Sequence, residues 1–290
     1  MKKVGYVSLL GRPNVGKSTL LNQFLHQKLS VVTPKPQTTR HKILGILNDE
    51  RGQILFLDTP GIFQPKIELH ERMVKTALKT LKDADLFLLL VEPTRPELNG
   101  ELLSTLKRVN KPTLLAINKI DTVAKEVLLP LIIEYKEIYN FNEFIPISAL
   151  KADGLEVLLQ SILHYLPEGE PLFPPDVLTE SPERFFVQEI IREKIFLQYG
   201  EEIPYSTTVV IDEFREQEGS KDHIRAIIYV EKESQKPILI GQKGDSLKRV
   251  GIRAREEIER FLGRPVYLEL WVKTRKNWSK KKEDLREFGY

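Results

Sequence analysis

An eight-residue glycine-rich stretch constrains this chain more than any other feature of its sequence. Residues 11–18 read Gly-Arg-Pro-Asn-Val-Gly-Lys-Ser, which fits the pattern G-x-x-x-x-G-K-[ST] of a phosphate-binding loop, or P-loop. The apolar run 4–10 before it is typical of a strand, and residues 19–25 after it begin a helical pattern. Because a P-loop needs a strand before it and a helix after it, the sequence predicts an α/β nucleotide-binding unit in this region.

The residue types in this loop explain how it would bind a nucleotide. Gly11 and Gly16 allow a tight turn whose N–H groups face an anion, and the following helix points its positive N-terminal end at the same place. Lys17 brings a charge to the β- and γ-phosphates, and the Ser18 hydroxyl suits Mg²⁺. The residues expected to contact the nucleotide here are Gly11, Arg12, Pro13, Asn14, Val15, Gly16, Lys17, Ser18 and Thr19.

Composition excludes several classes of protein. The chain has 290 residues, enough for two domains, and its 41% hydrophobic and 29% charged content is typical of globular proteins. The absence of cysteine excludes disulfide bonds, thiol catalysis and cysteine-bound zinc. No apolar run reaches the length of a membrane span, and the first predicted strand begins so early that we expect no signal peptide. We therefore expect a cytoplasmic protein.

Charge is unevenly distributed, although the net charge is only +3. Residues 241–286 contain 14 lysine and arginine residues against 7 acidic residues, a net of +7, while the rest of the chain carries 30 against 34, a net of −4. A basic segment suits a polyanionic partner, and solvated helix faces are the alternative explanation.

Residues 1–165 alternate short apolar runs with longer amphipathic ones, which predicts a mostly parallel sheet with helices on both faces. The predicted strands are Val4–Leu10, Lys42–Asn48, Gln53–Asp58, Leu86–Val91, Thr113–Asn118 and Phe144–Ile147. The predicted helices are Ser18–Gln27, Ile67–Lys82, Glu97–Val109, Lys125–Tyr139 and Leu155–Tyr165. The turn at residues 48–52 is too short for a helical crossover, so the strands beside it should form an antiparallel hairpin.

The pattern changes after a proline-rich stretch at residues 167–181, which we expect to be a stiff linker. The sequence thus predicts a first domain over residues 1–166 and a smaller α+β domain over residues 182–290. The elements expected in the second domain are a helix over Pro182–Tyr199 with Ser181 at its N-cap, strands over Ser206–Phe214, His223–Glu231 and Val266–Lys273, and a long helix ending at Leu262.

A second motif follows the third predicted strand, which runs into Asp58-Thr59-Pro60-Gly61. An acid at the carboxyl end of a buried strand lies where a P-loop protein needs its Mg²⁺ partner. A glycine three residues later allows its backbone N–H to approach a γ-phosphate.

Two further motifs predict that the nucleotide base is guanine. The strand at residues 113–117 runs into Asn118-Lys119-Ile120-Asp121, and the two acceptor oxygens of Asp121 match the N1–H and N2–H₂ donors of guanine while leaving adenine mispaired. Ser148 and Ala149 follow the next strand, where a backbone N–H can reach the guanine O6.

These four motifs, in this order, resemble those of small Ras-like GTPases. The resemblance implies that Lys17 and Ser18 bind phosphate and Mg²⁺ and that Asp58 lies behind the metal. The segment 36–40, Pro-Gln-Thr-Thr-Arg, resembles switch I, whose threonine closes onto the metal and the γ-phosphate. Thr39 is preferred for this role because it precedes Arg40, and Thr38 stays open as the alternative.

One position departs from the Ras pattern. Ras-like GTPases place a glutamine directly after Asp-x-x-Gly to orient the attacking water, and this chain has Ile62. We therefore expect slow hydrolysis, with water positioned by backbone, by switch I or by a bound partner. In related GTPases the residue at Asn14 helps to hold a potassium ion near the phosphates, which makes K⁺ an optional cofactor beside GTP, GDP and Mg²⁺.

The residues expected to act in hydrolysis are Lys17, Thr39, Gly61 and Asn14, and those expected at the metal are Ser18, Thr39 and Asp58. The residues expected to bind the nucleotide beyond the P-loop are Thr38, Asp58, Thr59, Pro60, Gly61, Ile62, Asn118, Lys119, Ile120, Asp121, Ser148 and Ala149.

The basic part of the chain contains Ile240-Gly241-Gln242-Lys243-Gly244-Asp245-Ser246-Leu247, which fits the G-x-x-G signature of a KH domain. In that fold the loop joins two helices and clamps about four nucleotides of single-stranded nucleic acid. The residues expected to contact RNA are Ile240, Gly241, Gln242, Lys243, Gly244, Lys248, Arg249, Arg253, Lys273 and Arg275. We expect Trp271 to pack in a core, whereas Trp278 can either stack on bases or anchor the C-terminal tail.

A GTPase domain, a proline-rich linker and a type II KH domain together resemble the Era family of bacterial ribosome-assembly GTPases over essentially the whole chain. The resemblance implies a monomer that binds the 3′ end of 16S ribosomal RNA and assists maturation of the 30S subunit, with weak peripheral association with the inner membrane. Two alternatives stay open. The chain could bind RNA constitutively and keep GTP as a structural ligand, or its KH-like domain could bind protein.

Overall fold

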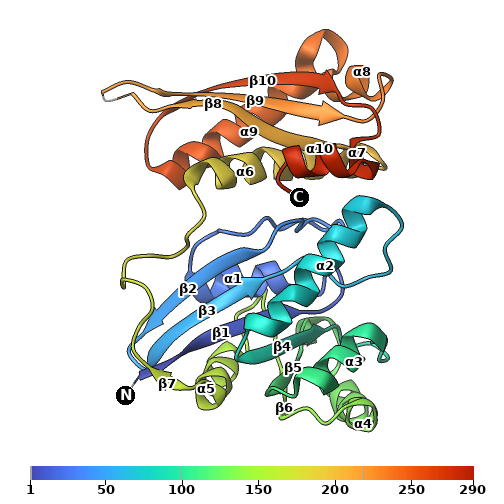
Figure 1. Ribbon diagram of the computed structural model, residues 1–290, viewed down its shortest axis with the longest axis vertical. Coiled ribbons are helices and arrows are strands. Elements are labelled where there is room, and N and C mark those ends of the chain that lie inside the picture. Colours follow the sequence, from blue (N-terminus) through green and yellow to red (C-terminus); the bar gives the residue numbers. More distant parts are fainter. Residues whose placement is uncertain (1, 99, 218) are drawn as a thin grey trace. The chain divides into compact units, whose positions relative to one another are not determined.

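The computed structural model describes residues 2–98, 100–217 and 219–290 and divides the chain into two compact units. The first consists of residues 1–66 and 70–180, and the second of residues 181–290 together with residues 67–69. The first unit is an α/β structure and the second, smaller one is α+β (Figure 1), so the predicted fold class is confirmed. Within the described ranges, no helix is both long enough and apolar enough to cross a membrane.

The first unit contains the predicted alternation of strands and helices. Its strands are β1 (Lys2–Leu10), β2 (Ile43–Asp49), β3 (Gly52–Asp58), β4 (Leu86–Val91), β5 (Thr113–Ile117), β6 (Glu143–Pro146) and the short β7 (Glu168–Gly169). Its helices are α1 (Lys17–Leu25), α2 (Glu68–Asp83), α3 (Gly100–Val109), α4 (Leu128–Ile138) and α5 (Leu155–Tyr165), with single 3₁₀ turns at Ile120–Thr122 and Lys125–Val127.

The sheet order positions the motifs. The strands lie in the order β2-β3-β1-β4-β5-β6, and β7 pairs with β1. Strands β3, β1, β4, β5 and β6 are mutually parallel, whereas β2 and β3 form the predicted antiparallel hairpin. Because parallel strands share one carboxyl edge, the segments that follow β1, β3, β5 and β6 all begin at that edge.

Helices cover both faces of the sheet, and the strands β3, β4 and β5 are buried throughout. Helices α2, α3 and α4 contribute Leu81, Leu106 and Leu131 to one buried cluster with strands β4 and β5. On the opposite face, Phe24 of α1 stacks on Phe56 of β3 with a centroid distance of 5.1 Å. All residues of β4 are buried, which explains its uninterrupted apolar sequence.

The proline-rich segment 167–180 lies along the hairpin of the first unit. Gln53, which is 1% exposed, accepts bonds from the backbone N–H of Leu172 and Phe173 at 2.7 and 3.0 Å. The N–H of Ile46 donates to the carbonyl of Leu178 at 2.8 Å. The segment predicted as a linker is thus held by hydrogen bonds to β2 and β3 over most of its length.

The second unit is a three-stranded sheet with helices on one face. Its helices are α6 (Glu183–Gln198), α7 (Ile203–Ser206), α8 (Gln235–Ile240), α9 (Asp245–Leu262) and α10 (Lys282–Glu287), and its strands are β8 (Thr208–Arg215), β9 (Asp222–Val230) and β10 (Val266–Thr274). The strand order is β10-β9-β8, with β10 parallel and β8 antiparallel to β9. The predicted cap of α6 is wrong by one residue, because Pro182 has extended dihedral angles and is itself the N-cap.

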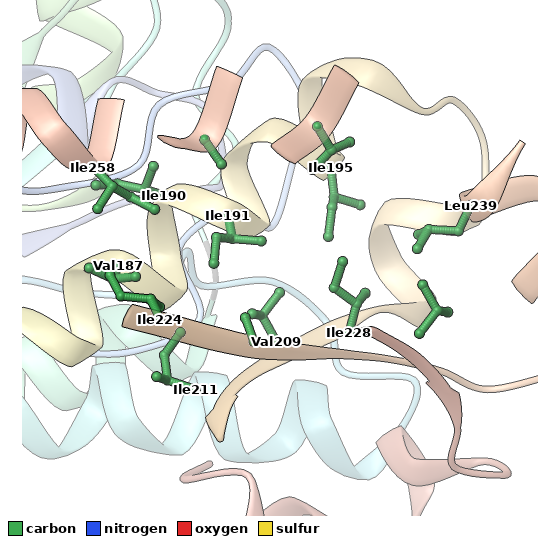
Figure 2. Close-up of a cluster of buried hydrophobic side chains, with 14 of the residues drawn as sticks. Val187, Ile190, Ile191, Ile195, Val209, Ile211, Ile224, Ile228, Leu239 and Ile258 are labelled. Carbon is green, nitrogen blue, oxygen red and sulfur yellow. The ribbon is translucent and has the colours of Figure 1, made fainter. Parts of the chain in front are cut away.

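The core of this unit lies between the sheet and helices α6 and α9. Figure 2 shows Ile191 and Ile195 of α6 and Ile258 of α9 facing Val209, Ile224 and Ile228 of the sheet. The predicted packing role of Trp271 is wrong, since its side chain is 57% exposed on the edge strand β10. Trp278 is fully buried and donates to the carbonyl of Ser206 at 2.9 Å, so it anchors the tail.

Candidate functional site

The P-loop connects β1 to α1 through a backbone that requires both of its glycines. Gly11 has φ 140° and Gly16 has φ 101°, conformations that L side chains rarely adopt. A Cβ at Gly11 would lie 2.4 Å from the carbonyl oxygen of Leu90, and one at Gly16 would lie 2.1 Å from Nδ2 of Asn118. The loop therefore lies directly against the segment after β5.

Lys17 is held inside this loop by backbone carbonyl groups. Its side chain is 5% exposed, and Nζ donates to the carbonyl oxygens of Arg12 at 3.0 Å and Gly11 at 3.3 Å. Burial lowers the pKa of Lys17 to about 8, although the negative charge of Asp58 opposes that shift. A polyphosphate beside Nζ would favour the charged form of the amine.

Asp58 gathers the oxygen atoms that predict a metal site. Its Oδ2 accepts bonds from the hydroxyls of Ser18 at 2.8 Å and Ser30 at 2.7 Å, and burial raises the pKa of its carboxyl group. Its Oδ1 is buried and has no hydrogen-bond partner among the described residues. A buried carboxylate oxygen without a partner, next to hydroxyl oxygens, fits a hard cation such as Mg²⁺.

The two threonines of the segment resembling switch I have different surroundings. Thr39 Oγ1 lies 2.9 Å from the Ser18 hydroxyl, beside the Asp58 carboxylate. Thr38 is buried, and its hydroxyl bonds to Thr33 Oγ1 and to the carbonyl oxygen of Lys35, each at 2.7 Å. The geometry thus favours Thr39 for the metal, and Thr38 instead stabilises the loop.

The P-loop and residues 31–39 also touch each other and enclose a cavity. Asn14 Nδ2 donates to the carbonyl oxygen of Pro34 at 2.8 Å. The cavity has a volume of about 70 Å³. Its lining combines the predicted residues Pro13, Asn14, Gly16, Lys17, Ser18, Thr19, Thr38, Thr39 and Gly61 with Val31, Val32, Thr33 and Gln37.

The segment after β3 packs tightly against the P-loop. A Cβ at Gly61 would lie 2.5 Å from the backbone nitrogen of Pro13. Thr59 is fully buried and donates to the carbonyl oxygen of Leu9 at 2.8 Å. The Ile62 N–H donates to the Gly11 carbonyl at 3.0 Å, and its side chain is 3% exposed in the core. Ile62 therefore fixes the position of Gly61 through packing and has no polar group to offer water.

The residues predicted to bind a base meet at the carboxyl ends of β5 and β6. Asn118 joins two loops, because its Nδ2 donates to the carbonyl of Val15 at 2.7 Å and its Oδ1 accepts the N–H of Ala149 at 2.9 Å. Ser148 Oγ donates to Asp121 Oδ1 at 2.6 Å, which orients the carboxylate. Ile120 donates its N–H to Ile147 at 3.2 Å. These bonds build a rigid acceptor group beside the P-loop.

Two charged side chains predicted at the nucleotide form ion pairs with acidic residues. Lys119, with φ 64°, forms an ion pair with Glu92 at the end of β4. Arg12 forms an ion pair with Glu97 at the surface. A cavity of about 410 Å³ lies between these two pairs and is lined by P-loop, β4 and α3 residues.

In the second unit, the predicted G-x-x-G loop joins α8 to α9, as the signature requires. Gly241 has φ 75°, and a Cβ there would lie 2.6 Å from Ser246. Gly244 has φ 83° with nothing within 4 Å of a Cβ, so its backbone is open to a close approach. Gln242 and Lys243 are exposed at the tip of the loop.

A groove of about 400 Å³ runs from this loop between α9 and β10. Its lining consists of Gly244, Leu247, Lys248, Gly251, Ile252, Arg255, Leu268 and Leu270. Gly251 keeps it open, because a Cβ there would already touch Leu270 at 3.5 Å. The apolar floor, two cations and exposed backbone suit a nucleobase and its phosphate.

The other basic residues predicted to contact RNA differ in their exposure and in whether acidic residues already pair with them. Lys273 and Arg253 are exposed. Arg249 pairs with Asp245 one turn earlier on α9. Arg275 binds Asp284 at 2.6 Å and Glu287 at 2.8 Å, so much of its charge is already compensated. Ile240 is half-buried and packs against the core of the unit.

Sequence reasoning missed two groups of residues. Ser30 and Asn22 belong to no motif, and contacts made after folding bring Ser30 to Asp58 and Asn22 to Ser30. Gly251 and Ile252 line the groove, and their helical spacing from Gly244 could have indicated them.

The fold and these two sites define a P-loop GTPase joined to a KH domain. A family model described as "50S ribosome-binding GTPase" matches residues 6–119, and a model described as "KH domain" matches residues 202–279.

Comparison with individual proteins identifies the family more narrowly. The chain is 49% identical to GTPase Era of Geotalea uraniireducens over 288 residues, which cover 99% of this chain and 97% of that one. It is also 49% identical to GTPase Era of Syntrophus aciditrophicus, covering 100% and 96%. The chain therefore belongs to the Era GTPase family.

Solved Era structures have the same fold. A variant of Aquifex aeolicus Era bound to GDP·AlF₄⁻ is 46% identical with a TM-score of 0.95, and the match covers 99% of both chains. An Era in complex with MgGDPNP and nucleotides 1506–1542 of 16S ribosomal RNA is 45% identical with a TM-score of 0.96, covering 100% of this chain and 99% of that one.

The base site yields a first prediction. In Asp121→Asn, Oδ1 can still accept the hydrogen bond from Ser148. The new NH₂ group would then point at the base, where hydrogen-bond donors of the protein would meet the N1–H and N2–H₂ donors of guanine. Losing two bonds to a charged acceptor, each of about 1.5–3 kcal/mol, should weaken GDP binding roughly 100-fold or more. Xanthosine diphosphate, which has a carbonyl in place of the 2-amino group, should bind the variant better than GDP does.

Isothermal titration calorimetry with both nucleotides measures this exchange of preference. Asp153→Asn is the matched control, because Asp153 pairs through its backbone with Ser148, the partner of Asp121, and its side chain is exposed. An Asp121→Asn variant that keeps its preference for GDP would contradict the assignment of the base site.

Proposed function

We propose that this protein is a GTP-hydrolysing switch that binds 16S ribosomal RNA near its 3′ end and assists assembly of the small ribosomal subunit. The observation that carries the nucleotide part is the convergence of Ser18, Thr39 and Asp58 around one unpartnered carboxylate oxygen, next to the buried Lys17. This arrangement suits Mg²⁺ and a triphosphate, and the GDPNP and GDP·AlF₄⁻ complexes of related Era proteins support it.

In this proposal each residue has a defined task in hydrolysis. Mg²⁺, when bound, would neutralise charge on the β- and γ-phosphates. Ser18 and Thr39 would hold it, with Asp58 behind them, and Lys17 would stabilise the charge that develops on the phosphoryl oxygens. The Gly61 N–H would approach the γ-phosphate. Because Ile62 cannot orient water, intrinsic turnover is slow.

The RNA part is supported by the loop between Gly241 and Gly244, by the groove beside it and by the net charge of +7 over residues 241–286. The matching family model names the 50S subunit, whereas a solved relative holds RNA of the small subunit. We favour the small subunit because that relative matches the whole chain, including its KH domain.

We further propose that the two activities are linked. GTP would order residues 36–40 and Gly61 through Mg²⁺ and the γ-phosphate, and hydrolysis would release them. By thermodynamic linkage, a change in RNA affinity between nucleotide states requires an equal change in nucleotide affinity upon RNA binding.

Other features belong to the same proposal. The functional division is a GTPase domain over residues 1–166, a connecting segment over 167–181 and an RNA-binding domain over 182–290. The protein acts as a cytoplasmic monomer on the 30S subunit. Weak peripheral association with a membrane is supported only by the basic segment, which RNA binding explains equally well.

The RNA site gives the second prediction. Gly244→Asp places a carboxylate in open space at the mouth of the groove, where it would repel phosphate, and should weaken RNA binding tenfold or more while leaving GDP binding unchanged. Gly263→Asp is a matched control, because Gly263 also has a positive φ of 68° and nothing within 4 Å of a Cβ. Fluorescence anisotropy with an RNA of 16S 3′-end sequence, in GTP-analogue and GDP states, measures the RNA affinity, and titration calorimetry with GDP measures the nucleotide affinity.

The outcomes separate the competing functions. RNA affinity that is identical with GTP analogue and GDP would favour a constitutive RNA-binding protein. RNA affinity that is negligible in both the wild type and Gly244→Asp would favour a KH domain that binds protein.

The optional potassium ion gives the third prediction. If Asn14 helps to hold K⁺ near the phosphates, GTP turnover should be about tenfold or more faster in potassium than in sodium buffer, since an added cation stabilises transition-state charge. Asn14→Ala should abolish the difference, whereas Asn110→Ala, at another asparagine with positive φ, should preserve it. Equal phosphate-release rates in the two buffers would remove potassium from the mechanism.

A further inference from the structure

Ser30 is a buried residue that belongs to none of the nucleotide-binding motifs. Its side chain is 1% exposed, and its hydroxyl donates to Asp58 Oδ2 at 2.7 Å. The same oxygen accepts the Ser18 hydroxyl at 2.8 Å. With two donors on Oδ2, the unpartnered Oδ1 is the atom left for a further ligand.

Asn22 fixes the backbone on which Ser30 stands. Its Oδ1 accepts the N–H groups of Leu29 at 3.0 Å and Ser30 at 2.9 Å, and its Nδ2 donates to the Ser30 carbonyl at 2.8 Å. A single amide side chain thus occupies both backbone polar groups of Ser30. This leaves the serine little freedom to turn its hydroxyl away from Asp58.

The helix α1 connects the Asn22–Ser30 contacts, which we call the Asn22 clamp, to the P-loop. Ser18 and Asn22 are four residues apart on α1, so they lie on the same face of the helix. Ser18 holds Asp58 directly, and Asn22 holds it through Ser30. Ser30 also begins the stretch that leads to Thr39, whose hydroxyl lies 2.9 Å from Ser18.

We propose that Ser30, held by Asn22, is a positioning residue for the Mg²⁺ of the nucleotide complex. It orients the Asp58 carboxylate so that Oδ1 can bind the metal or a water on the metal. It also links the chain that leads to the switch I segment to the metal site. Outer partners of this kind typically contribute 10- to 100-fold to metal affinity. The inference rests on the proposed binding of Mg²⁺ and guanine nucleotide.

The test measures release of a fluorescent GDP, N-methylanthraniloyl-GDP, from the full-length protein over a range of free Mg²⁺ concentrations. The quantity compared is the Mg²⁺ concentration that gives half of the maximal slowing of release. Release in EDTA reports nucleotide binding without the metal and needs no catalysis.

Ser30→Thr and Ser30→Val form a matched pair, because they have the same shape and differ in the hydroxyl. We expect the valine variant and Ser30→Ala to need at least tenfold more Mg²⁺ than the wild type, and the threonine variant to stay within threefold of it. Release in EDTA should agree within twofold for all of them. Ser161→Ala is the control. Ser161 also donates a hydrogen bond to a carboxylate, that of Glu143 at 2.6 Å, and both residues are distant in sequence from Ser30 and Asp58.

Asn22→Ala tests the clamp. If Asn22 acts through Ser30, combining Asn22→Ala with Ser30→Ala should cost no more Mg²⁺ affinity than Ser30→Ala alone. Additive losses would overturn the role of Asn22.

Two results would overturn the role of Ser30. One is an unchanged Mg²⁺ requirement in Ser30→Val relative to Ser30→Thr, and the other is an equal loss of GDP binding with and without Mg²⁺. A wild type that releases GDP at the same rate with and without Mg²⁺ would instead overturn the proposed metal-dependent function.

Discussion

The buried carboxylate of Asp58 is the group on which the first unit depends. A buried charge is tolerated when it is paired and hydrogen-bonded, and Asp58 receives two hydroxyl bonds and the nearby charge of Lys17. Its second oxygen lacks a partner among the described residues. The low pKa of Lys17 and the raised pKa of Asp58 both reflect the cost of keeping these charges out of water. A metal–nucleotide complex would offset that cost, because it places opposite charges beside both groups.

The sheet topology places the residues expected to select the base next to those expected to bind phosphate. Parallel strands deliver the P-loop, Asp58 and Asn118 to one edge, and Asn118 then bonds Val15 and Ala149, so that the base site and phosphate site are joined by one side chain. The second unit uses backbone in a comparable way. Gly241 packs closely against Ser246, Gly244 leaves main chain open at a helix junction, and Gly251 opens an apolar groove beside it. In both units, glycine allows a polyanion to approach the backbone.

Sequence reasoning predicted the sheet, the hairpin and the motif positions because periodicity and glycine patterns are local. It failed where an answer depends on tertiary contacts. The alternation in β10 could not show that Trp271 lies on the uncovered face of an edge strand, and the proline content of residues 167–180 could not show that Gln53 binds them to the hairpin. The choice between Thr38 and Thr39 needed the position of Ser18, and Ser30 carried no motif at all.

Thermal unfolding of the full-length protein with Mg·GDP, with Mg·ADP and with GDP in EDTA tests most directly whether Asp58 and its neighbours form a metal–guanine nucleotide site. At 100 times the dissociation constant a ligand adds about 2.7 kcal/mol of stability, or roughly 5–10 °C for a unit of this size. We predict that shift with Mg·GDP, a smaller one in EDTA and almost none with Mg·ADP. An equal shift with Mg·ADP, or one that EDTA does not reduce, would contradict the account.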